Sequence, residues 1–309
     1  METIDPLVSV CLPTFNRAAS LRRALESLLA CSYHNIEIIV SDNASGDDTA
    51  NLVREFSGRD ARVKYFRHEQ NLGPTKNFEF ARAQASGKYF LWHADDDYLD
   101  RDYIRQCVSE LEANPSLVLV AGTGYYYDPD GALDHVDRDR VSSAEVPLWR
   151  VLVYLAAVAD NSIFCGVYRR NRALGSQLLN ALAGDWAWVA EMLMRGPAKV
   201  LPGVGVHRAF GAGTSASIKR TVEVLRAPRW HAYFPWVAQC SNVASQVALR
   251  SAGYRDGSIG KRSTVFISVY LVLALKGVVL NLRALLGRVP YAKLVYKGLR
   301  RRRAQRGLR

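Results

Sequence analysis

Short apolar runs alternate with segments of helical periodicity over the first hundred residues. Four apolar runs predict strands, at 7–12, 36–40, 63–66 and 89–92. The segments between them repeat apolar residues at helical spacing and predict helices, at 21–29, 49–56 and 78–85. Asn16 precedes the first of these helices, and we expect it to cap that helix. Alternating strands and helices are typical of an α/β fold with parallel strands and right-handed crossovers.

The pattern continues less regularly beyond residue 100. A helix is expected at 103–112, an apolar strand at 117–121 and an apolar helix at 148–158. Residues 134–139 are polar and charged, and we expect a loop there.

Three consecutive carboxylates follow the predicted strand at 89–92. Asp95, Asp96 and Asp97 repel one another unless a cation lies among them, because each carboxylate raises the pKa of its neighbours. Carboxylate oxygens suit hard divalent cations, and open α/β sheets bind ligands at the carboxyl ends of their strands. The cluster therefore predicts a site for a metal bound to a diphosphate. The alternative is an acidic turn that caps a helix starting near Asp102.

Asp42 follows the second predicted strand, where a doubly wound sheet meets a nucleotide base or ribose. Residues 42–46 also suit a turn that caps a helix, and the sequence leaves both interpretations open. The glycine-rich fingerprints of dinucleotide-binding proteins and of phosphate-loop proteins are absent. This argues against a Rossmann dehydrogenase and a P-loop kinase.

The net charge of +12 belongs to the C-terminal part of the sequence. Residues 255–309 contain fourteen Lys and Arg and one Asp, so residues 1–254 carry a charge of −1. A basic segment of this kind predicts an anionic partner such as a membrane surface. RNA is the weaker alternative because aromatic residues do not alternate with the arginines, and we expect no nucleic-acid partner.

The same region is also apolar. Residues 265–275 are apolar except for Ser268, Lys276 interrupts the run, and 277–286 continue it. A charge at the centre of a spanning helix costs about 2.5–3.5 kcal/mol. We therefore favour one or two helices lying in the membrane interface over a spanning helix, with residues 261–309 on an anionic membrane surface.

The cysteines and the N-terminus indicate the cellular compartment. The five cysteines lie far apart without paired spacing, which fits core residues in a reducing compartment. The N-terminus has no secretory signal pattern. We expect a catalytic domain at 1–218 and a helical, basic, membrane-associating region at 219–309, and the sequence leaves the oligomeric state open.

Four motifs in order resemble those of family-two inverting glycosyltransferases of the bacterial cell-envelope and polysaccharide type. The motifs are at 8–17, 37–49, 71–73 and 87–97, and the resemblance covers roughly residues 6–215. It implies the GT-A fold, a mixed, mostly parallel α/β sheet flanked by helices. It also implies transfer of a sugar from a nucleotide-diphosphate donor with inversion at the anomeric carbon, assisted by Mg²⁺ or Mn²⁺.

The resemblance implies roles for individual residues at the donor site. The residues along or near the base are Pro13, Thr14, Phe15 and Asp42. Lys76, or Arg17, would neutralise the diphosphate. Asp95 and Asp97 correspond to the first and last acids of the D-x-D motif, with Asp95 near the donor ribose and Asp97 on the metal. Because three acids are consecutive, Asp96 stays a candidate.

Asp185 is the candidate general base. Inverting transfer needs one group to take the proton of the acceptor hydroxyl, and flanking Trp186 and Trp188 would raise the pKa of a partly desolvated carboxylate. The resemblance places an acid before the base, where this chain has Gly184. Glu191 is the fallback, and Asp185 as a plain helix cap is the alternative.

A glycine-rich segment at 204–215 resembles the part of the family that covers the diphosphate. Arg208, or His207, would stabilise the leaving nucleoside diphosphate. The sequence thus predicts a glycosyltransferase on the cytoplasmic face of a membrane, acting on a lipid-linked or cell-envelope glycan. The competing functions are a catalytically idle nucleotide-sugar-binding scaffold and a sugar nucleotidyltransferase.

Overall fold

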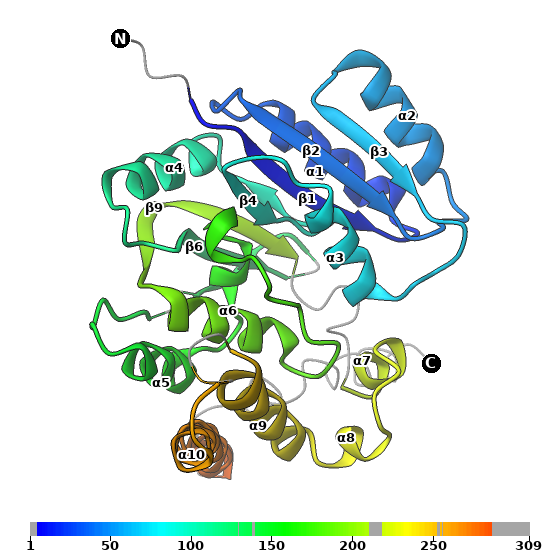
Figure 1. The fold of residues 1–309 in the computed structure, drawn as a ribbon. Helices are drawn as coiled ribbons and strands as arrows, with labels where there is room; N and C mark the ends of the chain where they lie inside the picture. The colour runs from blue at the N-terminus through cyan, green and yellow to red at the C-terminus, as the bar shows by residue number, and fades with distance from the viewer. Residues whose placement is uncertain are drawn as a thin grey trace.

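A computed structural model describes residues 5–128, 130–137, 140–209, 218–251, 254 and 256–285. Its centre is a nine-stranded sheet with helices on both faces (Figure 1). The path through the sheet is β3-β2-β1-β4-β8-β6-β9-β5, and β7 pairs with β6 beside this path.

The N-terminal half alternates strands and helices, as the sequence predicts. Its strands are β1 (Val8–Thr14), β2 (Ile36–Asp42), β3 (Val63–Arg67) and β4 (Tyr89–Trp92). Its helices are α1 (Ala18–Leu29), α2 (Thr49–Arg59) and α3 (Pro74–Ala83). These four strands are parallel, and Thr14 pairs with Asp42 where β1 and β2 end. The segments that follow β1, β2 and β4 therefore meet at one edge of the sheet.

The second half of the sheet is mixed. Its strands are β5 (Tyr98–Leu99), β6 (Leu119–Tyr127), β7 (Leu133–Asp137), β8 (Val167–Arg169) and β9 (Ala198–Ala209). Its helices are α4 (Tyr103–Ala113), α5 (Pro147–Ala157) and α6 (Gly184–Arg195), with the short turns η1 (Ser162–Cys165) and η2 (Arg170–Arg172). β8 runs antiparallel between β4 and β6, whereas β9 is parallel to β6. This mixed sheet flanked by helices confirms the predicted fold class.

The sheet separates two buried clusters. On one face, Val8 and Val10 of β1 pack with α1, α2 and α4. On the other, Phe90 and Trp92 of β4 pack with α5 and α6, where the Trp92 ring lies 5.7 Å from that of Trp188. Successive residues of β4 point to opposite faces, so both clusters hold this strand and fix where the acids after it emerge.

The C-terminal helices share the second cluster. They are α7 (Ile218–Val224), α8 (Trp230–Tyr233), α9 (Pro235–Ser245), the π-helical turn η4 (Gln246–Arg250) and α10 (Ile259–Leu285). Figure 1 shows α9 and α10 beside α5 and α6, and Val265, Val269 and Leu273 of α10 are buried there. One buried cluster thus contains residues from both sides of position 218. The division into a catalytic domain at 1–218 and a C-terminal region at 219–309 stays a prediction.

The prediction of a loop at 134–139 is wrong over its first part. Residues 133–137 form β7, which pairs antiparallel with the end of β6. Main-chain groups make this pairing, so polar side chains do not prevent it in a strand with an exposed face. Residues 138 and 139 lie outside the described residues.

The prediction that Asn16 caps α1 is also wrong. Asn16 has a φ of 53°, and its Oδ1 accepts a hydrogen bond from the Gly46 amide at 2.7 Å. Asp47 accepts one from the Ala18 amide at 3.0 Å, in the first turn of α1. The polar cap comes from the loop after β2, and the two loops support each other.

Candidate active site

The run of three acids begins shortly after β4, at the edge where β1 and β2 also end. Asp95 accepts hydrogen bonds from Thr14 Oγ1 at 2.7 Å and from Arg17 at 3.2 Å, and Arg17 also pairs with Asp96. Burial raises the pKa of Asp95 to about 6, while the guanidinium of Arg17 opposes this shift. Arg17 therefore neutralises part of the negative charge of the first two acids.

Asp97 faces Arg208 of β9. Arg208 Nε donates to Asp97 Oδ2 at 3.0 Å, and Nη1 donates to the hydroxyl of Tyr126 at 3.0 Å. The same guanidinium lies 5.5 Å from the centre of the Tyr126 ring. Burial raises the pKa of Asp97 to about 7, although Arg208 lowers it. The charge of Asp97 is thus only partly compensated.

A divalent cation fits this acidic run. Asp95 and Asp97 are buried carboxylates with raised pKa values, and a second positive charge would stabilise their ionised forms. In the part of the chain that the structure describes, no group of three His, Cys, Asp or Glu side chains is arranged to hold a metal. Mg²⁺ commonly takes one or two carboxylates together with phosphate oxygens and water. The site suits a cation that arrives with a diphosphate.

Asp185 lies in the first turn of α6. Its Oδ2 accepts a hydrogen bond from Asn161 Nδ2 at 2.8 Å, and Asn161 Oδ1 accepts one from the Tyr154 hydroxyl at 2.6 Å. Burial raises the pKa of Asp185, whereas Asn161 and Arg208 lower it. Arg208 lowers the pKa of both Asp97 and Asp185, so its guanidinium lies within electrostatic range of the two acids.

The chain turns sharply into α6 just before Asp185. Ala183 has a φ of 59°, and a Cβ atom at Gly184 would lie 2.1 Å from the carbonyl oxygen of Leu179. Position 184 therefore has no room for a side chain. The acid that the family resemblance places before the base would therefore not fit at this turn.

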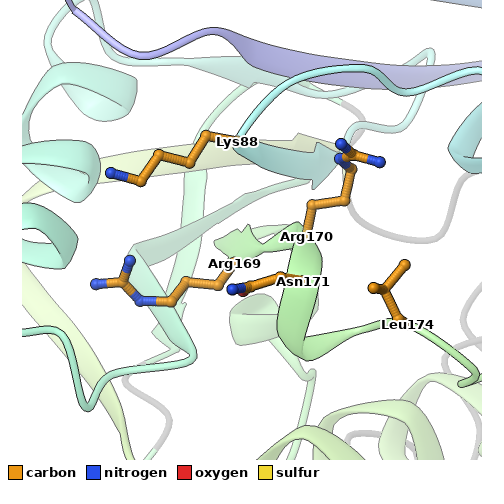
Figure 2. A pocket seen from close by; sticks show the side chains of 5 residues that line it. All are labelled: Lys88, Arg169, Arg170, Asn171 and Leu174. Atoms are coloured by element: carbon orange, nitrogen blue, oxygen red, sulfur yellow. The ribbon is translucent and has the colours of Figure 1, made fainter.

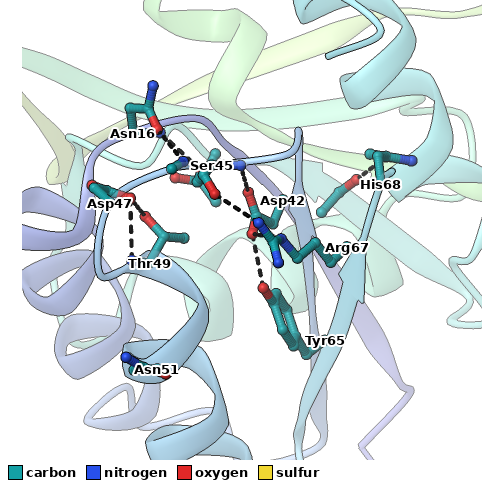
Figure 3. Close-up of polar contacts among 12 residues, drawn as sticks. Asn16, Asp42, Ser45, Asp47, Thr49, Asn51, Tyr65, Arg67 and His68 are labelled. Carbon is teal, nitrogen blue, oxygen red and sulfur yellow. Dashed lines mark hydrogen bonds and ion pairs between the residues drawn. The ribbon is translucent and has the colours of Figure 1, made fainter. Parts of the chain in front are cut away.

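Asp42 is fully buried at the end of β2 (Figure 3). Its Oδ1 accepts from the Ser45 amide at 2.8 Å, and its Oδ2 accepts from the Tyr65 hydroxyl at 2.8 Å. Arg67 lies 3.5 Å from the same carboxylate and donates to the Ser45 carbonyl at 2.8 Å. Asp42 therefore orders the loop after β2, as the interpretation of residues 42–46 as a turn predicts. This loop lies at the edge of the sheet where a base would bind.

The other predicted donor-site residues lie along the same edge. Pro13 and Thr14 are the last residues of β1, and Phe15 beside them is 41% exposed. Lys76 is exposed in the first turn of α3. An exposed ring and an exposed ammonium group are suited to contact a nucleotide.

His207 and Arg208 are adjacent in β9 and have different partners. His207 lies 2.8 Å from the Tyr127 hydroxyl and 2.8 Å from Asp100, and it stacks on Tyr98. Arg208 instead contacts Asp97. The geometry favours Arg208 for the diphosphate. The remainder of the predicted glycine-rich segment, residues 210–215, lies outside the described residues.

Glu191 is buried in α6 and serves the core. Its Oε1 accepts from Ser176 at 2.7 Å and from Arg195 at 2.9 Å, and its Oε2 accepts from Gln246 at 2.7 Å. Both oxygens are occupied by structural partners. Of the two candidate bases, Asp185 therefore remains a candidate, and Glu191 is held by the core.

The sequence pattern predicts no individual role for Asn161 or Tyr154. Asn161 is buried with a φ of 58°, a conformation that Asn adopts more readily than most residues. Its partner Asp185 lies 24 residues later in the chain, so no local pattern identifies this contact.

A cavity of about 180 Å³ lies at the opposite, amino end of β4. It is lined by Lys88, Arg169, Arg170, Asn171 and Leu174 (Figure 2). Lys88 pairs with Glu112 at 2.6 Å, and both arginines donate to main-chain carbonyls. These cations are occupied by structural partners, and the cavity is remote from the three acids.

Comparisons with known proteins bear on the family and the fold of the chain. The family model "Glycosyl transferase family 2" matches residues 9–171. A GalNAc(5)-diNAcBac-PP-undecaprenol beta-1,3-glucosyltransferase of Campylobacter jejuni is 40% identical over 95 residues, which cover 30% of this chain and 31% of that protein. Chondroitin synthase of Pasteurella multocida is 29% identical over 128 residues, which cover 41% of this chain and 13% of the synthase. The alignments thus span less than a third of either relative.

Solved structures share the fold. TarS of S. aureus in complex with UDP-GlcNAc has a TM-score of 0.56 at 19% identity, covering 84% of this chain and 70% of that one. The mannosyltransferase PcManGT of Pyrobaculum calidifontis, in complex with GDP-Man and Mn²⁺, has a TM-score of 0.53 at 18% identity, covering 94% and 78%. Because the family model matches more than half of its length, the chain belongs to glycosyl transferase family 2.

Proposed function

We propose that this protein is a metal-dependent inverting glycosyltransferase. It moves a sugar from a nucleotide-diphosphate sugar to a hydroxyl of a lipid-linked or cell-envelope glycan. The observation that carries the proposal is the ion pair of Arg208 with Asp97, with Asp185 within electrostatic range of the same guanidinium. These residues supply a cation for the leaving diphosphate and a carboxylate for the acceptor proton.

The donor binds along the edge formed by the ends of β1, β2 and β4. Pro13, Thr14 and Phe15 line the base, and Asp42 orders the loop against which the base rests. Lys76 and Arg17 approach the diphosphate, and Asp95 lies near the ribose. The structures of TarS with UDP-GlcNAc and of PcManGT with GDP-Man, which share this fold, support a nucleotide-sugar donor.

Asp97, together with Asp95, would hold Mg²⁺ or Mn²⁺ on the diphosphate. The cation would neutralise the negative charge that develops on the departing nucleoside diphosphate. Arg208 adds a positive charge at the same place, and Tyr126 holds its guanidinium. The Mn²⁺ in the PcManGT complex supports a metal in this fold.

Asp185 takes the proton of the acceptor hydroxyl. The acceptor oxygen bonds to the anomeric carbon as the bond to the diphosphate oxygen breaks on the opposite face, which inverts the configuration. The electron pair leaves with the diphosphate, and the proton moves to the Asp185 carboxylate. Burial makes this carboxylate more basic than an exposed one, and Asn161 orients it.

Turnover by the Asp185→Asn variant tests the proposal. Transfer from a panel of UDP- and GDP-sugars with Mn²⁺ is expected to fall by about 10²–10⁴-fold, while donor binding measured by calorimetry is retained. Glu191→Gln is the matched control, because its carboxylate serves the core. Unimpaired transfer by Asp185→Asn would remove Asp185 from the mechanism. Turnover that a chelator does not change would show that the reaction needs no metal.

We also propose that α10 lies on the cytoplasmic face of a membrane, as part of a peripheral or monotopic protein. Among the described residues, one helical segment, Ile259–Leu282, is long and apolar enough to cross a membrane. Its inner face is buried against the protein, yet its outer face exposes large apolar side chains: Ile267, Leu271, Leu275, Val278 and Leu282. A helix that is apolar on both faces needs a second apolar partner. The basic residues within 261–309 suit anionic headgroups.

Vesicle flotation tests this part of the proposal. The full chain is expected to float with phosphatidylglycerol vesicles, and the paired variant Leu271→Glu/Leu275→Glu is expected to stay in solution. Leu174→Glu, exposed at a distant site, is the matched control. Extraction by carbonate would indicate peripheral binding, whereas resistance to it would indicate a helix inserted in the bilayer. Dimers that are lost in the paired variant, without flotation of the wild type, would assign the face to a second copy.

A further inference from the structure

A cavity of about 230 Å³ opens beside Asp185. Apolar side chains from four separate elements line it, among them Phe78 of α3, Phe164 of η1, Leu179 before α6 and Leu225 after α7. Asp185 is the charged residue among its described lining residues, and Thr75 and Thr221 are the hydroxyl-bearing ones. The candidate base therefore lies on the border of an apolar cavity.

The walls of this cavity are tied to one another. Thr75 Oγ1 donates to Asn180 Oδ1 at 2.8 Å, and Asn180 Nδ2 donates to the Leu225 carbonyl at 3.0 Å. Glu79 of α3 accepts from the Leu178 amide at 2.5 Å. Asn242 of α9 donates to the Leu182 carbonyl at 3.1 Å. These bonds fix the segment before α6 between α3 and the C-terminal helices, so the cavity is a built feature of the fold.

The lining restricts what enters. Each sugar hydroxyl that leaves water without finding a partner loses binding energy, and most of this wall offers no hydrogen bond. An apolar group loses nothing on entering and gains by leaving water. A group held here would lie next to the carboxylate that takes the acceptor proton. The fitting ligand therefore combines a reactive hydroxyl with an adjacent apolar substituent.

We propose that this cavity binds the methyl-bearing substituent of an amino or deoxy sugar on the acceptor. The methyl group of an acetamido sugar or of a 6-deoxy sugar enters between Phe78, Phe164 and Leu225, and a neighbouring hydroxyl faces Asp185. This inference rests on the proposed function, because Asp185 as base assigns the cavity to the acceptor. It makes α7, in the C-terminal region, a part of the acceptor site.

Acceptor selectivity tests the inference. Methyl β-glycosides of N-acetylglucosamine, N-acetylgalactosamine and a 6-deoxyhexose are compared with those of glucose and galactose. With the nucleotide sugar that gives turnover, the substituted acceptors are expected to show a kcat/KM at least about 10-fold higher. Leu225→Asn should reduce this ratio toward one, whereas Leu174→Asn, exposed outside the cavity, should leave it unchanged.

Saturation-transfer NMR on the same glycosides gives a readout that does not depend on turnover. The strongest saturation transfer is expected at the methyl group of the glycoside, and this signal should be lost with Leu225→Asn. Equal kcat/KM for all acceptors would overturn the inference while the proposed function stands. Leu225→Asn could instead change the ratio of the KM values for UDP-GlcNAc and UDP-Glc and leave the acceptor selectivity intact. In that case the cavity would bind the donor sugar. Saturation transfer to the methyl group, with no glycosylation of any of these glycosides, would overturn the proposed function and the acceptor assignment, and would leave a cavity that binds methyl groups.

Discussion

The ammonium group of Lys276 lies 4.9 Å from the centre of the Trp186 ring. It also donates to the carbonyl oxygens of Leu155, at 3.2 Å, and of Val158, at the C-terminal end of α5. The charge that interrupts the apolar run of α10 therefore points into the protein. Trp186 is the neighbour of Asp185, so the proposed membrane helix contacts the turn that carries the candidate base.

Lys276→Met tests this contact. The variant leaves the last carbonyls of α5 without their donor and removes a positive charge from a helix C-terminus, which should cost about 1–3 kcal/mol. We expect a lower free energy of unfolding in urea but unchanged vesicle flotation, because the outer face of α10 is intact. Lys261→Met, exposed on the same helix, is the control and should change stability less. Equal stability of the two variants would contradict this role.

The sequence predicted the first half of the fold well because each strand and helix there has its own local pattern. The runs at 36–40 and 63–66 became β2 and β3 almost unchanged. Residues 134–137 were missed as a strand because β7 is specified by main-chain pairing with β6, which leaves no apolar signal. The sequence shows that Lys276 interrupts the apolar run that begins at residue 265. Its partner Trp186 lies ninety residues earlier in the chain, beyond any local pattern.

The site shows the same limit. The three acids and Asp185 are candidates from the sequence because carboxylates in an apolar context stand out there. The preference for Arg208 over His207 depends on their partners, Asp97 and Asp100, which only the pairing of β9 brings close. The role of Asn161 depends on a φ of 58° that no residue pattern encodes.

The raised pKa of Asp97 predicts a pH dependence of stability. A carboxyl group with a higher pKa in the folded protein contributes stability below its unfolded pKa and loses it as the pH rises through the folded pKa. Between its ordinary value of 3.8 and about 7, the metal-free wild type should lose stability relative to Asp97→Asn. The loss is on the order of 1.4 kcal/mol for each unit by which the pKa is raised.

Urea unfolding in a chelator at several pH values measures this difference. The comparison with Asp97→Asn is needed because other groups titrate in the same range. Asp95 acts in the same direction, whereas buried His93, with its pKa lowered to about 4, loses stability as the pH falls. A difference between the two proteins that does not change with pH would contradict the assignment. Mn²⁺ with UDP should flatten the slope for the wild type.

Gly184→Ala should destabilise the protein although Ala is the better helix former. Its Cβ would lie 2.1 Å from the Leu179 carbonyl oxygen, a main-chain atom that cannot rotate away. We expect a loss of about 1–3 kcal/mol in chemical unfolding, together with reduced transfer. Gly58→Ala in α2 is the matched control, because a Cβ there meets nothing within 4 Å and should stabilise the helix by about 0.5–1 kcal/mol. Similar effects of both changes would exclude the steric explanation.

Asn161→Gly should impair proton transfer while leaving the backbone in place. Glycine adopts a φ of 58° without strain, so this variant removes the hydrogen bonds to Asp185 and from Tyr154 without straining the backbone, whereas Asn161→Ala adds backbone strain. Because Asn161 lowers the pKa of Asp185, its loss should move the acid limb of the pH–rate profile upward. We expect kcat to fall by about 10–100-fold, with the donor KM unchanged. Tyr154→Phe, which removes the support of Asn161, should give a smaller shift in the same direction. A lower kcat without any shift of the acid limb would mean that Asn161 serves only the fold.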